Sequence, residues 1–248
     1  MPILALDFDG VLCDSVDETG ISGWKTGGVI WEEMSAEKPP VELLAGFRHA
    51  RPVIEKGHEA VLLMRLLLDG EDPERLLADF PDRAPAVLER SGLDADSLKT
   101  LFGSTRDRWR ASAPGEWLAA SPFYPGVADW LNARPGDPDR FIVTTKEERF
   151  VAHLFLGNGI DFPAEQVFGL DRGEPKEARL RTLAERDTER KVCFIEDRLA
   201  TLQRCQGRAE LASIALYLAG WGYNTEQERE EARRQSIPVL TLADLLRL

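Results

Sequence analysis

The stretch Ile3-Leu4-Ala5-Leu6-Asp7-Phe8-Asp9-Gly10-Val11-Leu12 decides how this chain folds. A short apolar run, typical of a buried strand, ends in two carboxylates two residues apart, and a glycine follows them. Side chains alternate along a strand, so Asp7 and Asp9 share a face only while the chain stays extended. Gly10 instead predicts a sharp turn that leaves both acids in a loop at the carboxyl end of the strand. Ligands bind at that end in open α/β sheets, and two carboxylates this close need a cation between them or a retained proton.

The second half of the chain alternates strand-like and helix-like segments. Strands are predicted at residues 141–145, 166–170, 192–195, 214–219 and 237–240. Helices are predicted between and after them at residues 147–156, 176–186, 199–205 and 241–248. Strands separated by helices of this length form right-handed crossovers and a parallel sheet, so the fold class is α/β. The strand before Asp7 must join the same sheet, because a single strand cannot fold alone.

Residues 15–122 lack strand signals and follow a helical pattern instead. One amphipathic stripe is formed by Leu98, Leu101, Phe102, Thr105 and Trp109. Breaks between helices are predicted at Pro39-Pro40, Asp69-Gly70, Pro81, Ser91-Gly92 and Pro114-Gly115. This long stretch without strands indicates an inserted helical domain. The predicted domains are a discontinuous core of residues 1–14 and 123–248, and a helical insertion of residues 15–122.

The segment after the first acidic loop is rich in glycine and is predicted to be a loop. Its distinctive residues are Gly20, Gly23, Trp24, Gly27 and Gly28. The glycines suit a close approach of the backbone to a ligand or a mobile lid, and a plain surface loop is the simpler alternative.

The composition is that of a soluble globular protein, with 43% apolar and 30% charged residues among 248. The formal net charge of −12 argues against binding to nucleic acid or to an anionic membrane, because phosphates attract the opposite sign. A small phosphorylated molecule remains compatible, since a local cation and a few basic side chains can reverse the field inside one cleft. The cysteines, Cys13, Cys193 and Cys205, show no metal or redox spacing, and neither a signal peptide nor a membrane span is recognisable. We therefore expect a cytoplasmic location, and no protein partner is evident.

Four predicted strands end in reactive side chains or lead into loops that carry them. In chain order these residues are Asp7 and Asp9, Thr144, Lys176, and finally Glu196 and Asp197. The carboxyl ends of parallel strands lie on one edge of a sheet, so these groups are expected to converge. Each also has a simpler interpretation: acidic pairs cap helices or form turns, a lone threonine belongs to its strand, and a lone lysine is solvated. Their occurrence together at four strand ends favours a functional site.

Over its whole length the chain resembles the haloacid dehalogenase-like (HAD) hydrolases. Asp7-Phe8-Asp9-Gly10-Val11 is similar to their first motif and Ile142-Val143-Thr144 to their second. Lys176 is similar to the third motif and Ile195-Glu196-Asp197 to the fourth. Residues 122–127 resemble the segment that returns from the cap domain, and residues 219–223 resemble a segment after the fifth strand, in which Trp221 and Tyr223 are interpreted as packing residues. The resemblance implies a Rossmann-like core with its active site under an inserted helical cap of the C1 type.

The resemblance also implies a role for each motif residue. Asp7 would be the nucleophile that forms an aspartyl-phosphate, and Asp9 would protonate the leaving oxygen and later deprotonate the attacking water. The implied cofactor is Mg²⁺, held by Asp7, by the backbone carbonyl of Asp9 and by Asp197, with Glu196 as a direct or water-bridged ligand. Substrate phosphoryl oxygens would be bound by Gly10, Thr144, Thr145 and Lys176. Many relatives carry another acid shortly after the fourth motif, whereas Thr201 and Leu202 stand there in this chain.

Asp9 favours hydrolysis of a phosphate monoester over cleavage of a carbon–halogen bond, because a halide leaves without needing a proton. A phosphomutase shares all these core residues and stays open as an alternative, as does a non-catalytic binding protein that retains the fold. Phosphonate hydrolysis would require a cap lysine able to form a Schiff base, for which the candidates by location are Lys25, Lys38, Lys56 and Lys99. The expected substrate is a small phosphorylated metabolite whose identity the sequence does not reveal.

Overall fold

The computed structural model describes residues 2–248 and divides into two compact units. One unit combines the residues up to Asp14 with Pro122–Leu248, and the other is Ser15–Ser121. Within the described chain, every strand belongs to the first unit, and the second is built from helices. No helix in residues 2–248 is both long enough and apolar enough to cross a lipid bilayer.

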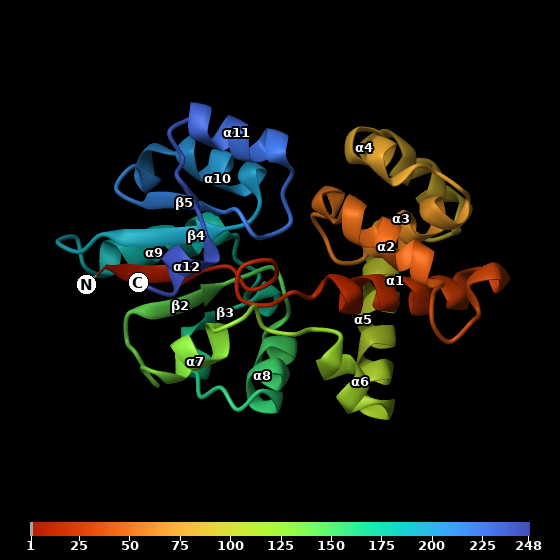
Figure 1. The fold of residues 1–248 in the computed structure, drawn as a ribbon, viewed down its shortest axis with the longest axis horizontal. Helices are drawn as coiled ribbons and strands as arrows, with labels where there is room; N and C mark the ends of the chain where they lie inside the picture. Colours follow the sequence, from red (N-terminus) through yellow and green to blue (C-terminus); the bar gives the residue numbers. More distant parts are fainter. Residues whose placement is uncertain (1) are drawn as a thin grey trace. The chain divides into compact units, whose positions relative to one another are not determined.

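The first unit is built on a parallel six-stranded sheet with the order β3-β2-β1-β4-β5-β6 (Figure 1). Its strands are β1 (Ile3–Leu6), β2 (Arg140–Val143), β3 (Val167–Phe168), β4 (Val192–Glu196), β5 (Ala215–Ala219) and β6 (Val239–Leu240). β1 lies between β2 and β4, with Leu6 opposite Ile142 on one side and Ile195 on the other. This confirms the α/β, Rossmann-like sheet and the return of the first strand into it. The strand order reverses at β1, where open α/β sheets bind their ligands.

Four of the strands are shorter than the sequence predicted, and β3 and β6 differ most. β3 has only two residues, because the 3₁₀ turns η3 (Ala164–Gln166) and η4 (Leu170–Arg172) take up the chain on either side of it. β6 also has two residues, Val239 and Leu240. β2 ends at Val143, so the two threonines that follow it lie in the loop beyond the strand.

The helices of this unit fill the connections between the strands. They are α7 (Val127–Asn132), α8 (Glu148–Gly157), α9 (Lys176–Arg186), α10 (Leu199–Gln206), α11 (Glu226–Arg234) and α12 (Leu242–Leu245), with the 3₁₀ turn η5 (Ala209–Leu211) after α10. One apolar core joins Ile3 and Ala5 of β1 to Leu180 of α9 and Leu202 of α10. Leu4 of β1 points to the opposite side, because side chains alternate along a strand, and it is buried as well. The sheet is therefore covered on both faces, as a parallel sheet requires.

The second unit is all-helical, as predicted. Its elements are α1 (Val16–Ile30), η1 (Glu32–Met34), α2 (Val41–Ala50), η2 (Arg51–Val53), α3 (Glu59–Leu68), α4 (Pro73–Arg90), α5 (Ala95–Ser112) and α6 (Pro114–Ala119). The expectation of a loop over residues 20–28 was wrong, because this segment is part of α1. A Cβ at Gly23 would lie 2.7 Å from the Ala60 carbonyl oxygen of α3, so the glycine lets the two helix backbones pack closely. Buried packing of this kind outweighs the low helix propensity of glycine.

The predicted helix break at Pro81 was also wrong. α4 continues through Pro81 and Pro85, which are four residues apart and both exposed. Proline removes one N–H donor from a helix, but on the solvent side water can satisfy the carbonyl that is set free. The buried side of α4 carries Leu76, Phe80 and Val87, whose packing keeps the helix intact.

Candidate active site

β1 delivers Asp7 to the carboxyl edge of the sheet. The N–H of Asp7 donates to the Ile195 carbonyl of β4 at 2.9 Å, so the residue extends the pairing of the two strands. The chain then turns at Gly10, where φ is +79°, a left-handed conformation that costs other residues about 1–2 kcal/mol. A Cβ at Gly10 would overlap Oδ2 of Asp197, so the turn requires glycine for space as well as for conformation. The turn predicted after the acids is confirmed, and it brings their loop against the end of β4.

Three carboxylates meet at this edge. Asp7 follows β1, Glu196 is the last residue of β4, and Asp197 comes next in the chain. One oxygen atom from each lies within 4.8 Å of the others, and all three residues are buried. Three buried carboxylate oxygens repel one another unless a positive charge joins them, and they are the donors that a hard divalent cation such as Mg²⁺ prefers. The donor set therefore fits a hard divalent cation, the class to which Mg²⁺ belongs.

Lys176 supplies a positive charge next to these acids. It is the first residue of α9, and its Nζ lies 2.8 Å from Oδ2 of Asp7 and 2.7 Å from Oε2 of Glu196. Its side chain is only 10% exposed. Lys176 is therefore a buried cation in contact with two of the carboxylates, and not a solvated helix residue.

Burial governs the protonation of this cluster. Burial raises the pKa of Asp7 from 3.8 to about 7, and the negative charge of Glu196 adds to the effect, while Lys176 opposes it. Burial also raises the pKa of Glu196. For Lys176, burial disfavours the ammonium, but the charges of Asp7 and Glu196 outweigh this and hold its pKa above the usual range. The metal-free cluster thus carries more negative charge than its surroundings stabilise, which favours binding of a further cation.

The loop after β5 holds Asp197 in place. The backbone N–H of Tyr223 donates to Oδ2 of Asp197 at 2.8 Å. The Tyr223 hydroxyl donates to Oδ1 of Asp14 at 3.0 Å, and the indole N–H of Trp221 donates to the Val11 carbonyl at 3.1 Å. Both aromatic residues therefore use polar groups to join the first acidic loop to the loop after β5, which their interpretation as packing residues did not anticipate.

Asp9 is not among the three clustered carboxylates, although its charge contributes to the raised pKa of Asp7, and it contacts a different lysine. Nζ of Lys146 lies 3.0 Å from Oδ1 of Asp9 and 3.4 Å from Oδ2. Lys146 is buried although it stands in the loop between β2 and α8. The sequence analysis did not identify it, because a lysine in a polar loop has the pattern of a surface residue. The one available signal was its position two residues after Thr144, at a strand end already predicted to contribute to the site.

Comparison with known proteins relates this geometry to a known fold. No family model matches the sequence, and no curated protein matches it either. Among solved structures, a predicted phosphoglycolate phosphatase from Haemophilus somnus 129pt superposes with a TM-score of 0.60 at 16% identity, covering 100% of this chain and 97% of the other. A predicted phosphatase from Clostridium acetobutylicum gives 0.56 at 14% identity, with 98% and 95% covered. A haloacid dehalogenase-like hydrolase from Streptococcus pneumoniae gives 0.55 at 14% identity, with 99% and 97% covered.

The chain has the HAD-like hydrolase fold. The four segments that carried the resemblance in the sequence occupy neighbouring strand ends of this HAD-like sheet. Thr144 follows β2 directly and is buried, and its Oγ1 accepts the N–H of Lys146 at 3.2 Å. Thr145 is exposed. Neither Thr201 nor Leu202 offers a carboxylate, and Leu202 belongs to the apolar core.

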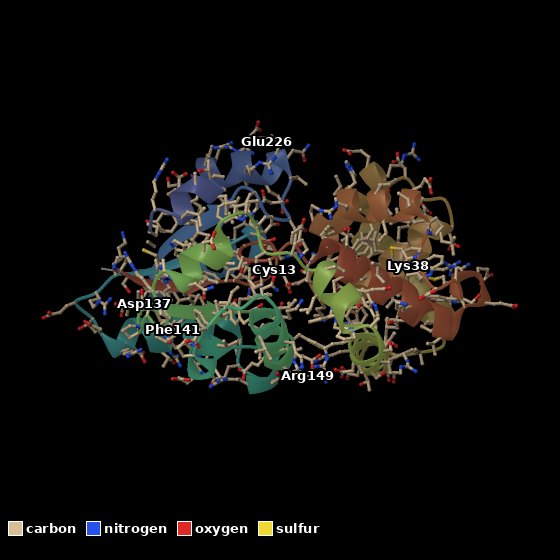
Figure 2. All side chains as sticks on the ribbon, turned by 60° about the horizontal axis from the view of Figure 1, so that its bottom comes forward. Cys13, Lys38, Asp137, Phe141, Arg149 and Glu226 are labelled. Carbon is tan, nitrogen blue, oxygen red and sulfur yellow. The ribbon has the colours of Figure 1, made fainter. Side chains whose placement is uncertain are left out.

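The lysines considered for Schiff-base chemistry lie in the helical unit, where Figure 2 shows Lys38. Lys38, Lys56 and Lys99 are all exposed, and Lys38 pairs with Glu116 at 3.5 Å. An exposed ammonium lacks the desolvation that activates a lysine amine. Lys25 is half-buried and donates to the Glu37 carbonyl at 3.0 Å. The helical unit by itself therefore offers no buried, activated lysine among its described residues.

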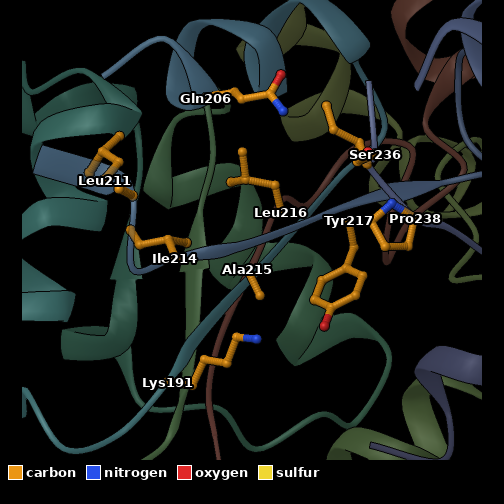
Figure 3. Close-up of a pocket in the computed structure, with 11 residues that line it drawn as sticks. Lys191, Gln206, Leu211, Ile214, Ala215, Leu216, Tyr217, Ser236 and Pro238 are labelled. Carbon is orange, nitrogen blue, oxygen red and sulfur yellow. The ribbon is translucent and has the colours of Figure 1, made fainter. Parts of the chain in front are cut away.

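A separate groove of about 340 Å³ opens near the amino ends of three strands of the HAD-like sheet, opposite to the ends that carry the acids (Figure 3). Its lining includes Lys191, Ile214 and Pro238, which come just before β4, β5 and β6. Figure 3 shows the side chains of Lys191 and Tyr217 near one end of the groove and those of Gln206 and Ser236 near the other. None of the candidate catalytic residues lines it.

Proposed function

We propose that the protein is a Mg²⁺-dependent phosphatase that hydrolyses a phosphate monoester of a small metabolite through a covalent intermediate on Asp7. The observation that carries this proposal is the division of the acids into two groups. Asp7 lies in a buried cluster with Glu196, Asp197 and Lys176, while Asp9 pairs with a second lysine, Lys146. A nucleophile next to a cation site, with a separate acid two residues away, suits phosphoryl transfer.

The cluster would hold the Mg²⁺ ion through side-chain oxygens of Asp7 and Asp197 and the backbone carbonyl of Asp9, with Glu196 as a direct or water-bridged ligand. When bound, the ion offsets negative charge on the phosphoryl oxygens. Lys176 contributes a second positive charge at the same place, since its Nζ contacts Asp7 directly. Both charges favour the ionised form of Asp7, which a nucleophile requires.

In the first step an oxygen of Asp7 attacks phosphorus and the bond from phosphorus to the leaving oxygen breaks. Asp9 enters this step protonated and donates its proton to that oxygen, so the product departs as an alcohol. The N–H of Phe8 donates to Oδ1 of Asp7 at 2.8 Å and orients the carboxylate. The hydroxyl of Thr144 and the ammonium of Lys176 bind the phosphoryl oxygens, with Gly10 and Thr145 as further candidates. These groups stabilise charge that develops during transfer.

In the second step a water molecule attacks the phosphorus of the aspartyl-phosphate. Asp9, now ionised, accepts the proton from that water. The bond from phosphorus to Asp7 breaks, inorganic phosphate leaves, and both carboxylates return to their starting states. The same two acids therefore serve both steps in opposite roles.

Generic phosphatase activity tests this proposal. We expect purified protein to release p-nitrophenol and inorganic phosphate from p-nitrophenyl phosphate only with Mg²⁺ present, and chelation to stop the reaction. Asp7→Asn should reduce turnover to background, whereas the exposed Asp161→Asn, a matched control in the same unit, should not change it. Activity without a divalent cation, or full activity in Asp7→Asn, would overturn the proposal.

A panel of phosphorylated metabolites then identifies the substrate. Phosphoglycolate belongs in this panel because it appears in the name of the H. somnus structure. Release of inorganic phosphate distinguishes hydrolysis from a mutase reaction, in which the phosphoryl group would be transferred to another hydroxyl group of the substrate.

A further inference from the structure

Lys146 is a buried cation that the four motifs do not include. It stands between β2 and α8, two residues after Thr144, and its side chain is 1% exposed. Transferring a lysine ammonium from water into a protein interior costs several kcal/mol unless an opposite charge compensates. A lysine in a connecting loop would normally extend into solvent, so its burial points to a specific partner.

That partner is the carboxylate of Asp9. The two Nζ–Oδ distances of 3.0 and 3.4 Å show that the ammonium contacts both carboxylate oxygens. The Asp9 side chain remains 23% exposed, so one side of it is open while the other rests on Lys146. An acid that must reach a substrate oxygen needs this combination of a fixed position and an open side.

The backbone around Lys146 is fixed as well. Its N–H donates to Oγ1 of Thr144 at 3.2 Å, and its carbonyl accepts the N–H of Leu170 at 3.1 Å. The first bond links it to the end of β2 and the second to the segment after β3. The position of the ammonium is thus set by two neighbouring strands.

The two buried lysines divide the acids between them. Lys176 contacts Asp7 and Glu196, and Lys146 contacts Asp9. We propose that Lys146 is a positioning residue, which donates hydrogen bonds to the carboxyl oxygens of Asp9 and so holds this group in place for the leaving oxygen. Without this contact, the Asp9 carboxyl group would lose the ammonium that fixes its orientation. The inference rests on the proposed phosphatase function and adds a residue to it.

Two aryl phosphates with different leaving groups test the inference. A nitrophenolate leaves readily, whereas the leaving oxygen of phenyl phosphate resembles that of tyrosine, with a pKa of about 10, and depends more on a proton donor. We expect Lys146→Gln to lower kcat/KM about tenfold or more for phenyl phosphate and clearly less for p-nitrophenyl phosphate. The loss should not exceed the roughly 10²–10⁴-fold that a general acid contributes in full. Lys146→Arg should retain more activity than Lys146→Gln. Substitution of the exposed Lys191 by glutamine is the control and should leave kcat/KM unchanged for both substrates.

Combining Lys146→Gln with Asp9→Asn separates action through Asp9 from other roles. If Lys146 acts through Asp9, the double variant should lose no more kcat/KM than Asp9→Asn alone. Equal losses on both substrates, or additive losses in the double variant, would overturn the inference, because they indicate contact with the phosphoryl group or a general structural role. If Lys146→Gln does not fold, the two-substrate comparison on Lys146→Arg decides, with the larger loss again expected for phenyl phosphate. If Asp9→Asn itself shows no dependence on the leaving group, the assigned role of Asp9 fails instead.

Discussion

Replacing the nucleophile should stabilise the metal-free protein at neutral and alkaline pH while abolishing the proposed activity. Burial and the charge of Glu196 raise the pKa of Asp7 from 3.8 to about 7. Between these values the folded state binds more protons at this position than the unfolded state does. The free energy of unfolding therefore falls as pH rises from about 4 to about 7, and it stays low above that. Asp7→Asn removes the titrating group and with it this loss.

The size of the effect follows from the same two pKa values. At about 1.4 kcal/mol per pH unit, the gap between 3.8 and about 7 corresponds to roughly 4 kcal/mol once Asp7 is fully ionised. Roughly 1–2 kcal/mol of this is already present at pH 5, so about 2–3 kcal/mol should be lost between pH 5 and pH 8. The contact with Lys176 lowers the pKa of Asp7, so its effect is already included in the value of about 7.

Urea denaturation in the presence of a chelator measures this difference. Wild type, Asp7→Asn and the control Asp161→Asn would each be unfolded at pH 5 and pH 8, followed by circular dichroism and by fluorescence. Wild type and the control should lose about 2–3 kcal/mol more than Asp7→Asn between the two pH values. Adding Mg²⁺ at pH 8 should stabilise wild type more than Asp7→Asn, because binding to the folded state raises its stability. The same pH dependence in wild type and Asp7→Asn would refute the reasoning.

Three further substitutions test other parts of the site. Lys176→Met should destabilise the protein by about 3–5 kcal/mol in urea denaturation, because it leaves the buried carboxylates of Asp7 and Glu196 without their shared ammonium, and unchanged stability would contradict this. Gly10→Ala should raise the Mg²⁺ concentration needed for half-maximal activity, since its Cβ would displace Asp197. Gly136→Ala is its matched control, because Gly136 has a φ of +65° and nothing lies within 4 Å of the added atom. This control should lower the free energy of unfolding by about 1–2 kcal/mol through backbone strain and keep the wild-type Mg²⁺ response. Tyr223→Phe should cost about 0.5–1.5 kcal/mol by removing the hydrogen bond to Asp14 while its N–H still holds Asp197, so a large change in Mg²⁺ dependence would argue against this division of roles.

Local sequence patterns were sufficient to predict those strands and helices whose own residues show a clear apolar run or helical periodicity. The apolar run before Asp7 and the one before Glu196 predicted β1 and β4, because a fully buried parallel strand reads as continuous apolar sequence. Helical periodicity over residues 15–122 predicted the all-helical unit. The convergence of Asp7, Lys176 and Glu196 followed from the geometry of parallel strands and not from detail of side-chain packing.

The errors came where long-range packing overrode local preference. Four glycines within residues 20–28 indicated a loop, but the segment is helical because the absence of side chains lets α1 pack closely against its neighbours, with Gly23 against α3. Pro81 indicated a helix end, but α4 continues because its prolines face solvent while its apolar side is buried. Neither outcome can be read from neighbouring residues, since each depends on what lies opposite the helix in the folded unit.

The sequence by itself determined the class of fold, the order of its strands along the chain, and which acids and which α9 lysine stand at the strand ends, because these properties depend on the periodicity and identity of residues close together in the chain. The sequence analysis did not predict the helices α7 and α11. Only the tertiary structure decided which charge contacts which. Lys146 and Asp9 are separated by 137 positions in the chain, and Tyr223 and Asp14 by 209. Such pairs form only when distant segments come together in the folded protein, where burial makes an uncompensated charge costly. A local sequence pattern does not predict them.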